Sequence, residues 1–190
     1  MNDLLHIASH FLIKGTPVSV KPLGDGLIND TYKVITAGED TPDYVLQRIN
    51  TDIFTDVDML QRNIISVTGH IRSKLREAGE TDLSRKTLTV VMADDGKAYR
   101  REDGSCWRMT VFIPRARTFD TVDTAHSYSA GTAFGRFEAM LADIGEMPGD
   151  IIPDFHNMEL RLRQLDDAVT NDAAGRASGV RDLLGELERR

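Results

Sequence analysis

The sequence predicts an α+β fold in which an antiparallel sheet of five or six strands, with one long helix, is followed by further helices. Up to about residue 113, short segments alternate apolar and polar residues at the period of a strand. One helical pattern, over residues 57–78, follows the third of these segments. Beyond Pro114 the apolar residues recur at helical spacing instead. We therefore expect a sheet domain over residues 1–113, a link over 114–120 and a helical region over 121–190.

Composition restricts the classes of partner. The chain has 190 residues, 41% of them apolar, and a net charge of -7, which repels nucleic acid and anionic membranes at long range. The single Cys106 allows no internal disulfide, and the first residues lack the pattern of a secretory signal. No apolar run approaches the length of a membrane span. We expect a cytoplasmic protein without nucleic-acid or membrane partners.

The first element is a short amphipathic helix over residues 3–13, which Gly15 and Pro17 end. His6 and His10 lie at i and i+4, a spacing by which a helix can offer two imidazoles to a metal. The sequence shows no third ligand beside them, so surface or packing histidines are favoured and we expect no metal site.

Two strand-like runs follow, joined through Gly24, Asp25 and Gly26. Glycine tolerates positive φ and allows a close approach of the backbone to an anion, so this hairpin could lie over phosphates. A plain turn is the commoner explanation of two glycines, and the hairpin alone does not decide between them.

A third strand is expected over residues 44–49, pairing with the second, and then the long helix, which ends at Gly79. Asp56 and Asp58 open that helix, where the positive end of its dipole explains two carboxylates better than a metal does. Three more strand segments are expected over residues 88–92, 98–100 and 106–113, with Asp95-Gly96 and Asp103-Gly104 as tight turns of two further hairpins.

The remainder is predicted to be helical. One helix begins near Thr124, a second near Met158, and a last one covers about residues 180–190. Because the chain stops within this last pattern, we expect a truncated helical region, and self-association over the apolar residues Leu183, Leu184 and Leu187 is a hypothesis.

Five segments carry more specific patterns, namely residues 7–11, 24–32, 44–54, 62–64 and 133–137. The most specific are Gly-Asp-Gly-x-Ile-Asn within 24–32 and Leu-Gln-x-x-Asn-Thr within 44–54. From about residue 5 to about residue 165, the chain resembles the N-terminal half of the bacterial N-acetylhexosamine 1-kinases, a branch of the aminoglycoside phosphotransferase family with a kinase-like fold. The resemblance implies an ATP-dependent kinase for the anomeric hydroxyl of an N-acetylated hexosamine, with Mg²⁺ as cofactor.

The resemblance also implies roles for individual residues of a nucleotide-binding N-lobe. The triphosphate would be covered by Gly24, Asp25, Gly26 and Asn29. Phe112, Ile113 and Pro114 would form the hinge that pairs with adenine, and because proline has no amide hydrogen, the donor must be a neighbour. Gln47 stands where kinases carry a phosphate-binding lysine, and its helical carboxylate partner is Asp56, Asp58 or absent. His156 and Arg161 begin the acceptor lobe, where they contact the sugar or lie on a solvated helix face.

The catalytic pattern of the family is absent from the sequence. No histidine begins a His-x-Asp-x-x-x-x-Asn motif, and Asp154-Phe155-His156 differs from the metal-binding Asp-Phe-Gly. We therefore expect no catalytic and no metal-binding residue in this chain, and interpret it as the N-terminal part of a sugar 1-kinase that does not turn over alone. The alternative is a non-catalytic nucleotide- or partner-binding module.

Overall fold

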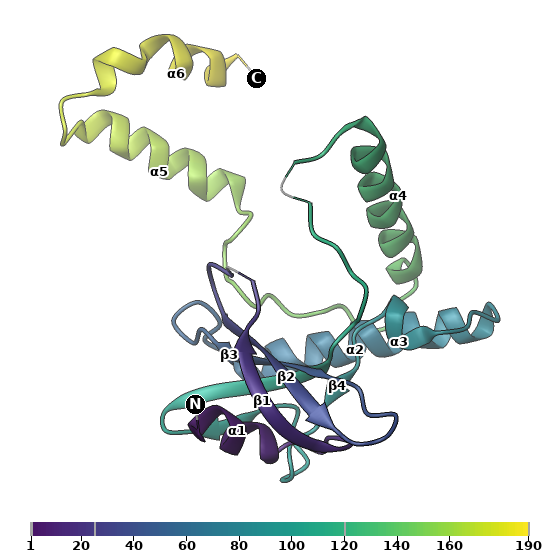
Figure 1. The fold of residues 1–190 in the computed structure, drawn as a ribbon. Helices are drawn as coiled ribbons and strands as arrows, with labels where there is room; N and C mark the ends of the chain where they lie inside the picture. The colour runs from purple at the N-terminus through teal and green to yellow at the C-terminus, as the bar shows by residue number, and fades with distance from the viewer. Residues whose placement is uncertain (1, 25, 120, 190) are drawn as a thin grey trace. The chain divides into compact units, whose positions relative to one another are not determined.

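The computed structural model describes residues 2–24, 26–119 and 121–189. It divides into two compact units, Met1–Ile151 and Ile152–Arg190. The first unit holds the sheet together with four helices, and the second is helical. The α+β fold predicted from the sequence is thus confirmed (Figure 1).

Six antiparallel strands form one sheet with the order β1-β2-β3-β6-β4, and β5 also pairs with β6. The long helix α2 (Val57–Glu77) follows the third strand, as predicted. The strands are β1 (Thr16–Pro22), β2 (Asp30–Ala37), β3 (Tyr44–Ile49), β4 (Val90–Val91), β5 (Arg100–Glu102) and β6 (Ser105–Val111).

The later strands pair differently from the prediction. Only β5 and β6 form a hairpin, through Asp103 and Gly104, which both have the positive φ that a two-residue turn of this kind requires. β4 pairs with β6 rather than with β5, and it is shorter than the pattern over residues 88–92 suggested. The tight turn expected at Asp95-Gly96 is present, since the Ala93 amide donates to the Lys97 carbonyl at 2.8 Å and Gly96 has a φ of 79°. The expected pairing of the strands on either side of it is wrong, because both short strands pair with the same edge of β6.

The first helix, α1 (Asn2–Ser9), ends earlier than its apolar spacing suggested. The backbone of residues 10–12 instead pairs with the segment after β4: the Asp94 amide donates to the His10 carbonyl, and Phe11 bridges Ala93. Phe11 remains buried, at 3% exposure, although it lies outside the helix. Sheet pairing therefore replaces helical hydrogen bonds without changing which side chain is buried.

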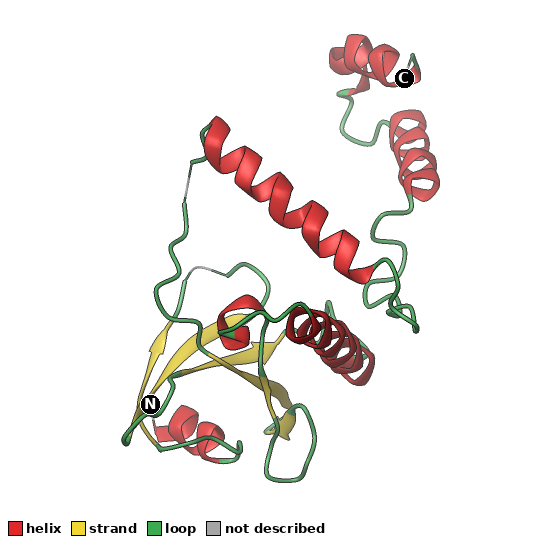
Figure 2. Ribbon diagram, turned by 90° about the vertical axis from the view of Figure 1, so that its right-hand side faces the viewer, coloured by secondary structure: helices red, strands yellow, loops and turns green. Residues whose placement is uncertain are grey.

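The sheet is covered on both faces, by α1 on one and α2 on the other (Figure 2). Strand alternation sorts the side chains: Leu46 and Met109 face α1, whereas Ile49 and Cys106 face α2. Toward α1 the core contains Ile7, Ala8, Phe11, Val34, Tyr44, Leu46, Val91, Ala93, Trp107 and Met109. Toward α2 it contains Ile49, Val57, Leu60, Tyr99 and Cys106.

Both ends of α2 are capped. The Asp56 carboxylate accepts a hydrogen bond from the Met59 amide at 2.8 Å, which is the standard N-cap contact. At the other end Gly79 has a φ of 72°, and the Glu80 amide reaches back to the Leu75 carbonyl at 2.9 Å. This is a Schellman ending, which glycine at that position permits.

The remaining helices of the first unit are α3 (Leu83–Lys86), which the sequence did not suggest, and α4 (Thr124–Leu141). The end of α4 is tied to α2, since His70 and Lys74 both contact the Met140 carbonyl and the Asp143 carboxylate. These contacts explain why α4 groups with the sheet rather than with the helices that follow it.

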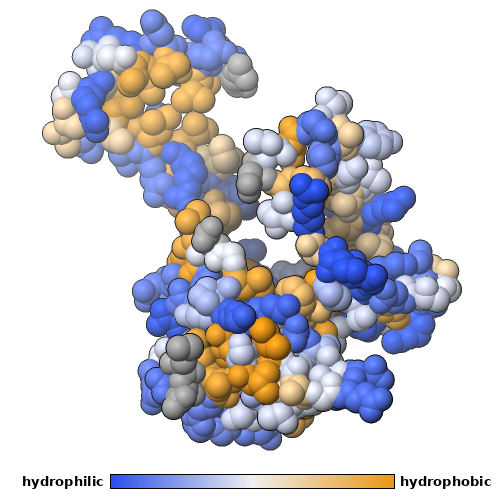
Figure 3. Space-filling view, viewed as in Figure 1, coloured by the Kyte–Doolittle hydropathy of each residue, from blue (hydrophilic) through white to orange (hydrophobic). Residues whose placement is uncertain are grey.

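The second unit contains α5 (Met158–Asn171), the 3₁₀ turn η1 (Ala177–Val180) and α6 (Arg181–Glu188). Its helices share a groove of about 600 Å³ lined by Leu162, Leu165, Asp166, Val169, Thr170, Leu184 and Leu187. Apolar side chains gather on the face of this unit seen in Figure 3. Within the described residues of the whole chain, no helix combines the length and apolar character that crossing a membrane demands.

Candidate functional site

A pocket of about 370 Å³ lies on the α2 side of the sheet. Its walls come from β3, β4 and β6, from α2, and from the segments that precede β4 and follow β6. The lining residues are Leu23, Val45, Gln47, Gln61, Ile64, Leu88, Val90, Arg108, Thr110, Val111, Phe112 and Ile113. Three residues predicted to bind nucleotide, Gln47, Phe112 and Ile113, are thereby brought together.

Strand register sorts this lining into a polar and an apolar part. Gln47 lies opposite Arg108, and one pleat further along Val45 lies opposite Thr110. Phe112 continues that face of the chain beyond β6. Polar groups therefore gather at one end of the pocket, and apolar groups gather at the other end, which Phe112 and Ile113 form.

The polar end is held by a chain of hydrogen bonds across three strands. Arg108 Nε donates to Gln47 Oε1 at 3.0 Å, and Gln47 Nε2 donates to Thr31 Oγ1 at 2.9 Å. Thr31 Oγ1 then donates to the Asn29 carbonyl at 3.3 Å. The contacts orient Gln47 by both ends of its amide and place the guanidinium of Arg108, from the neighbouring strand, beside it.

Arg108 contributes a positive charge to the partly buried polar end of the pocket. Burial lowers the pKa of the Arg108 guanidinium, although arginine stays charged at neutral pH. Among the ion pairs of the described residues none involves Arg108. A desolvated cation that lacks a counter-charge favours an anionic ligand.

Gln61 of α2 is the second unusual group. The residue is 3% exposed, and among the described residues neither Oε1 nor Nε2 has a hydrogen-bond partner. Gln61 lines the pocket from the helix, whereas Asp56 caps that helix and Asp58 accepts a hydrogen bond from the Tyr99 hydroxyl. Neither aspartate lines the pocket. The polar side chain that α2 contributes to the pocket lining beside Gln47 is therefore the amide of Gln61.

The end of the pocket formed by Phe112 and Ile113 has one backbone amide available among the described residues. The Phe112 amide donates to the Asp43 carbonyl at 2.9 Å, and the Pro114 carbonyl accepts from Arg85. Within the described chain the Ile113 amide makes no hydrogen bond. Lys33 Nζ lies 4.1 Å from the centre of the Phe112 ring, which fixes that ring beside the pocket.

The glycine hairpin begins next to the pocket, since Leu23 is a lining residue. Gly24 has a φ of 70° with open space around it, and Asp25 lies outside the described residues. A Cβ on Gly26 would stand 3.1 Å from the Asn29 carbonyl. The Asn29 side chain accepts a hydrogen bond from the Asn50 amide at 2.9 Å, so it braces the base of the hairpin against the end of β3.

The two residues expected to contact a sugar belong to the second unit. His156 is exposed and its ring meets that of Phe155, with centroids 4.5 Å apart. Arg161 donates to Gln164 and to the Asp154 carbonyl, so it closes the start of its own helix. Neither residue lines the pocket of the first unit.

Sequence reasoning missed Arg108 and Gln61. A signal for Arg108 was present, because a charged residue alternates with the core residues Trp107 and Met109 in a strand whose other face is covered by α2. Gln61 had no such signal, since a glutamine in an amphipathic helix is ordinary.

The chain was compared with protein-family models and with solved structures. No protein-family model matches the chain. Among solved structures, spectinomycin phosphotransferase APH(9)-Ia, in a complex with ADP and spectinomycin, is similar at 10% identity and a TM-score of 0.49. The similarity covers 77% of this chain and 38% of that one, so the chain spans well under half the length of the protein that it matches.

Proposed function

We propose that this chain is the nucleotide-binding lobe of an ATP-dependent phosphotransferase. The observation that carries the proposal is the pocket, which has an apolar part, a desolvated guanidinium and a buried amide. The part of the chain that the structure describes supplies neither a counter-charge for the guanidinium nor a hydrogen-bond partner for the amide. A nucleoside triphosphate has the matching parts, a flat base and a chain of anionic oxygens.

The residues of the pocket would bind both the base and the phosphates of the nucleotide. The base would enter between Val45, Leu88 and Phe112 and accept a hydrogen bond from the Ile113 amide. The phosphates would meet Arg108, whose guanidinium binds phosphate more strongly than the neutral amide of Gln47 does. Gln61 would donate through its unpaired Nε2. The net charge of -7 makes this local cation more important, because the long-range field repels the ligand.

The order of elements supports the same function. A glycine hairpin, a third strand, a long helix and then further antiparallel strands is the order of a kinase-type nucleotide lobe. In such lobes a lysine of the third strand contacts the phosphates, and a glutamate of the helix forms an ion pair with that lysine. Here the pair formed by Gln47 and Arg108 would contact the phosphates, and Gly24 and Gly26, with Asp25 between them and Asn29 bracing the loop, would cover the triphosphate.

The finer function rests on the sequence resemblance. We propose that the acceptor is the anomeric hydroxyl of an N-acetylated hexosamine or a related small alcohol, and that His156 and Arg161 contact it. No carboxylate lines the described pocket, so we assign Mg²⁺ no ligand there. The catalytic aspartate and the magnesium ligands would come from outside these 190 residues, and the chain by itself would bind ATP without turnover.

Calorimetric titration with three probes tests the nucleotide site. MgATP is expected to bind with a Kd below the millimolar range, adenosine more weakly through the end formed by Phe112 and Ile113, and tripolyphosphate through the Arg108 end alone. Competition by both fragments against MgATP would support a single two-part pocket. Absence of heat and of any chemical-shift change at millimolar MgATP would contradict the proposal.

The alternative function is a non-catalytic nucleotide- or partner-binding module. A nucleotide-binding module predicts the same titration result, so the two functions are distinguished by the coding sequence of the complete gene. A coding sequence that continues in frame to a His-x-Asp-x-x-x-x-Asn motif and a metal-binding aspartate supports the kinase. A coding sequence without them supports the module. Incubation of the protein expressed from the complete gene with MgATP and N-acetylglucosamine, followed by detection of the 1-phosphate, then tests the acceptor.

A further inference from the structure

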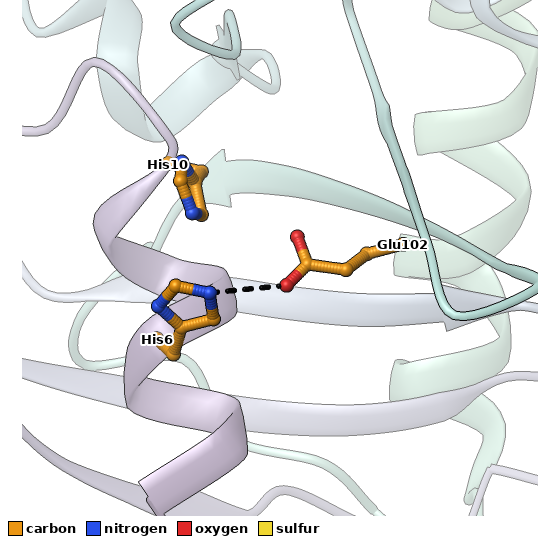
Figure 4. Close-up of side chains that lie close together, drawn as sticks. All are labelled: His6, His10 and Glu102. Carbon is orange, nitrogen blue, oxygen red and sulfur yellow. Dashed lines mark ion pairs between the residues drawn. The ribbon is translucent and has the colours of Figure 1, made fainter.

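Two histidines from α1 and its end, and a glutamate that ends β5, converge on one space (Figure 4). His6, His10 and Glu102 each present one ligand atom, and the three atoms lie within 4.8 Å of one another. His6 Nε2 is 3.2 Å from Glu102 Oε1, and the imidazole rings meet edge to face with centroids 4.7 Å apart. We propose that this cluster binds a divalent transition-metal ion, with Zn²⁺ preferred.

The set of donors selects the metal. Two imidazole nitrogens and one carboxylate oxygen suit Zn²⁺, whereas Mg²⁺ and Ca²⁺ take oxygen ligands. Ligand atoms around tetrahedral Zn²⁺ lie about 3.3 Å apart, which is close to the separation of His6 and Glu102 already present. The His6 side chain is 63% exposed and can therefore rotate to close the remaining distance to His10. A water molecule would complete four ligands.

Asp94 acts as a positioning residue for His10. Its Oδ2 lies 2.7 Å from His10 Nδ1, so in the neutral ring the proton resides on Nδ1 and Nε2 keeps its lone pair. A carboxylate that fixes the tautomer of a histidine in this way is the usual outer partner of a metal-binding imidazole. The contact with Asp94 thus supports a metal site independently of the spacing of the two histidines.

Arg100 holds both carboxylates in place. Its Nε donates to Glu102 Oε2 at 2.6 Å, and its Nη1 lies 3.1 Å from Asp94 Oδ1, so Glu102 Oε1 is the oxygen that faces His6 and the proposed metal. Two carboxylates and one guanidinium leave a charge of -1 around the neutral imidazoles, so a divalent cation is attracted. The ion would fasten α1 to the outer edge of the sheet, on the face away from the candidate nucleotide pocket.

Titration of the metal-free protein with ZnCl₂ at pH 7 tests the site. One ion per chain is expected to bind with a micromolar or smaller Kd and to raise the melting temperature, and Co²⁺ in its place is expected to show the visible absorption of a tetrahedral site. His10→Ala and Glu102→Gln should each remove this binding, and Asp94→Asn should weaken it by about 10- to 100-fold. His156→Ala serves as the control and should bind like the wild type.

Circular dichroism of each variant without metal shows whether it is folded, so that loss of the site is separated from loss of the helix. Zn²⁺ binding that is absent from the wild type, or that is equal in the wild type and His10→Ala, would overturn the proposal. MgCl₂ at the same concentration should leave the melting temperature unchanged, and a rise with Mg²⁺ that equals the rise with Zn²⁺ would also overturn it.

Discussion

Arg108 Nε lies 3.0 Å from Gln47 Oε1, and this contact joins two neighbouring strands at the polar end of the candidate nucleotide pocket. The amide accepts one of the five guanidinium hydrogens, and it neutralises none of the charge. Burial removes water from the charged guanidinium of Arg108, which lowers its pKa and destabilises the charged form. An anion bound there would reverse that cost, which explains how a pocket without a lysine could hold phosphate.

Replacing Arg108 by Met separates binding from stability. We expect Arg108→Met to weaken MgATP binding by about 10- to 100-fold, because a hydrogen bond to a charged group contributes about 1.5–3 kcal/mol. The melting temperature should not fall, since the change removes a desolvated charge without a counter-charge. Titration calorimetry and thermal melting measure the two effects, with the exposed Arg163→Met as control. Unchanged MgATP affinity in Arg108→Met would contradict the assigned role.

Replacing Gln61 by Leu should stabilise the ligand-free protein. Both polar atoms of this side chain are buried and find no hydrogen-bond partner among the residues that the structure describes, and an unsatisfied buried polar group costs about 1–3 kcal/mol. Urea unfolding should show a rise of that size in the free energy of unfolding, together with weaker MgATP binding. The exposed Gln164→Leu should change stability by less than about 0.5 kcal/mol. A loss of stability in Gln61→Leu would show that its amide has a partner.

Asp143 is expected to make the attachment of α4 sensitive to acid. The hydrogen bond from Lys74, assisted by one from His70, lowers the pKa of Asp143 below its ordinary value of 3.8. A carboxyl with a lowered folded pKa stabilises the fold above its unfolded pKa and loses that effect as pH falls through the folded pKa. The difference in melting temperature between the wild type and Asp143→Asn should therefore be full above pH 5 and shrink below pH 4. A constant difference from pH 7 to pH 3 would contradict this, and Asp166→Asn is the control.

Self-association through α6 stays a prediction of the sequence. Leu183 and Leu187 are 67% and 54% exposed, so their apolar surfaces are accessible in the second unit. If they form the contact, Leu183→Glu combined with Leu187→Glu should shift sedimentation from a larger species to the monomer. Exposed Met147→Glu should leave it unchanged. A monomer at every concentration of the wild type would remove this proposal.

Much of the fold could be predicted from local patterns. The third strand was predicted with its exact bounds, and the α2 helix within one residue, because period, caps and the Gly79 ending all agree there. The helices at Thr124 and Met158 were predicted from spacing alone. The errors fall where competing backbone partners decide the outcome, as at the end of α1 and along the outer edge of β6.

The candidate site was predicted in part. Gln47, Phe112 and Ile113 do line one pocket, because a strand position and its hinge can be read from sequence order. Arg108 could not be assigned, since its meeting with Gln47 depends on the register between strands that lie 61 residues apart. The same holds for Glu102, which reaches His6 only because β5 folds back along β6 toward the helix.

The chain's own residue pattern was sufficient to determine the strands, the long helix, their order and the glycine hairpin, because each depends on neighbours within a few residues. Only the tertiary structure decided that an arginine lies beside Gln47, that Gln61 is buried, and that a glutamate lies beside the two histidines. The physical reason is that charge and hydrogen bonding act between groups that are close in space, and the pairing of distant strands sets that closeness.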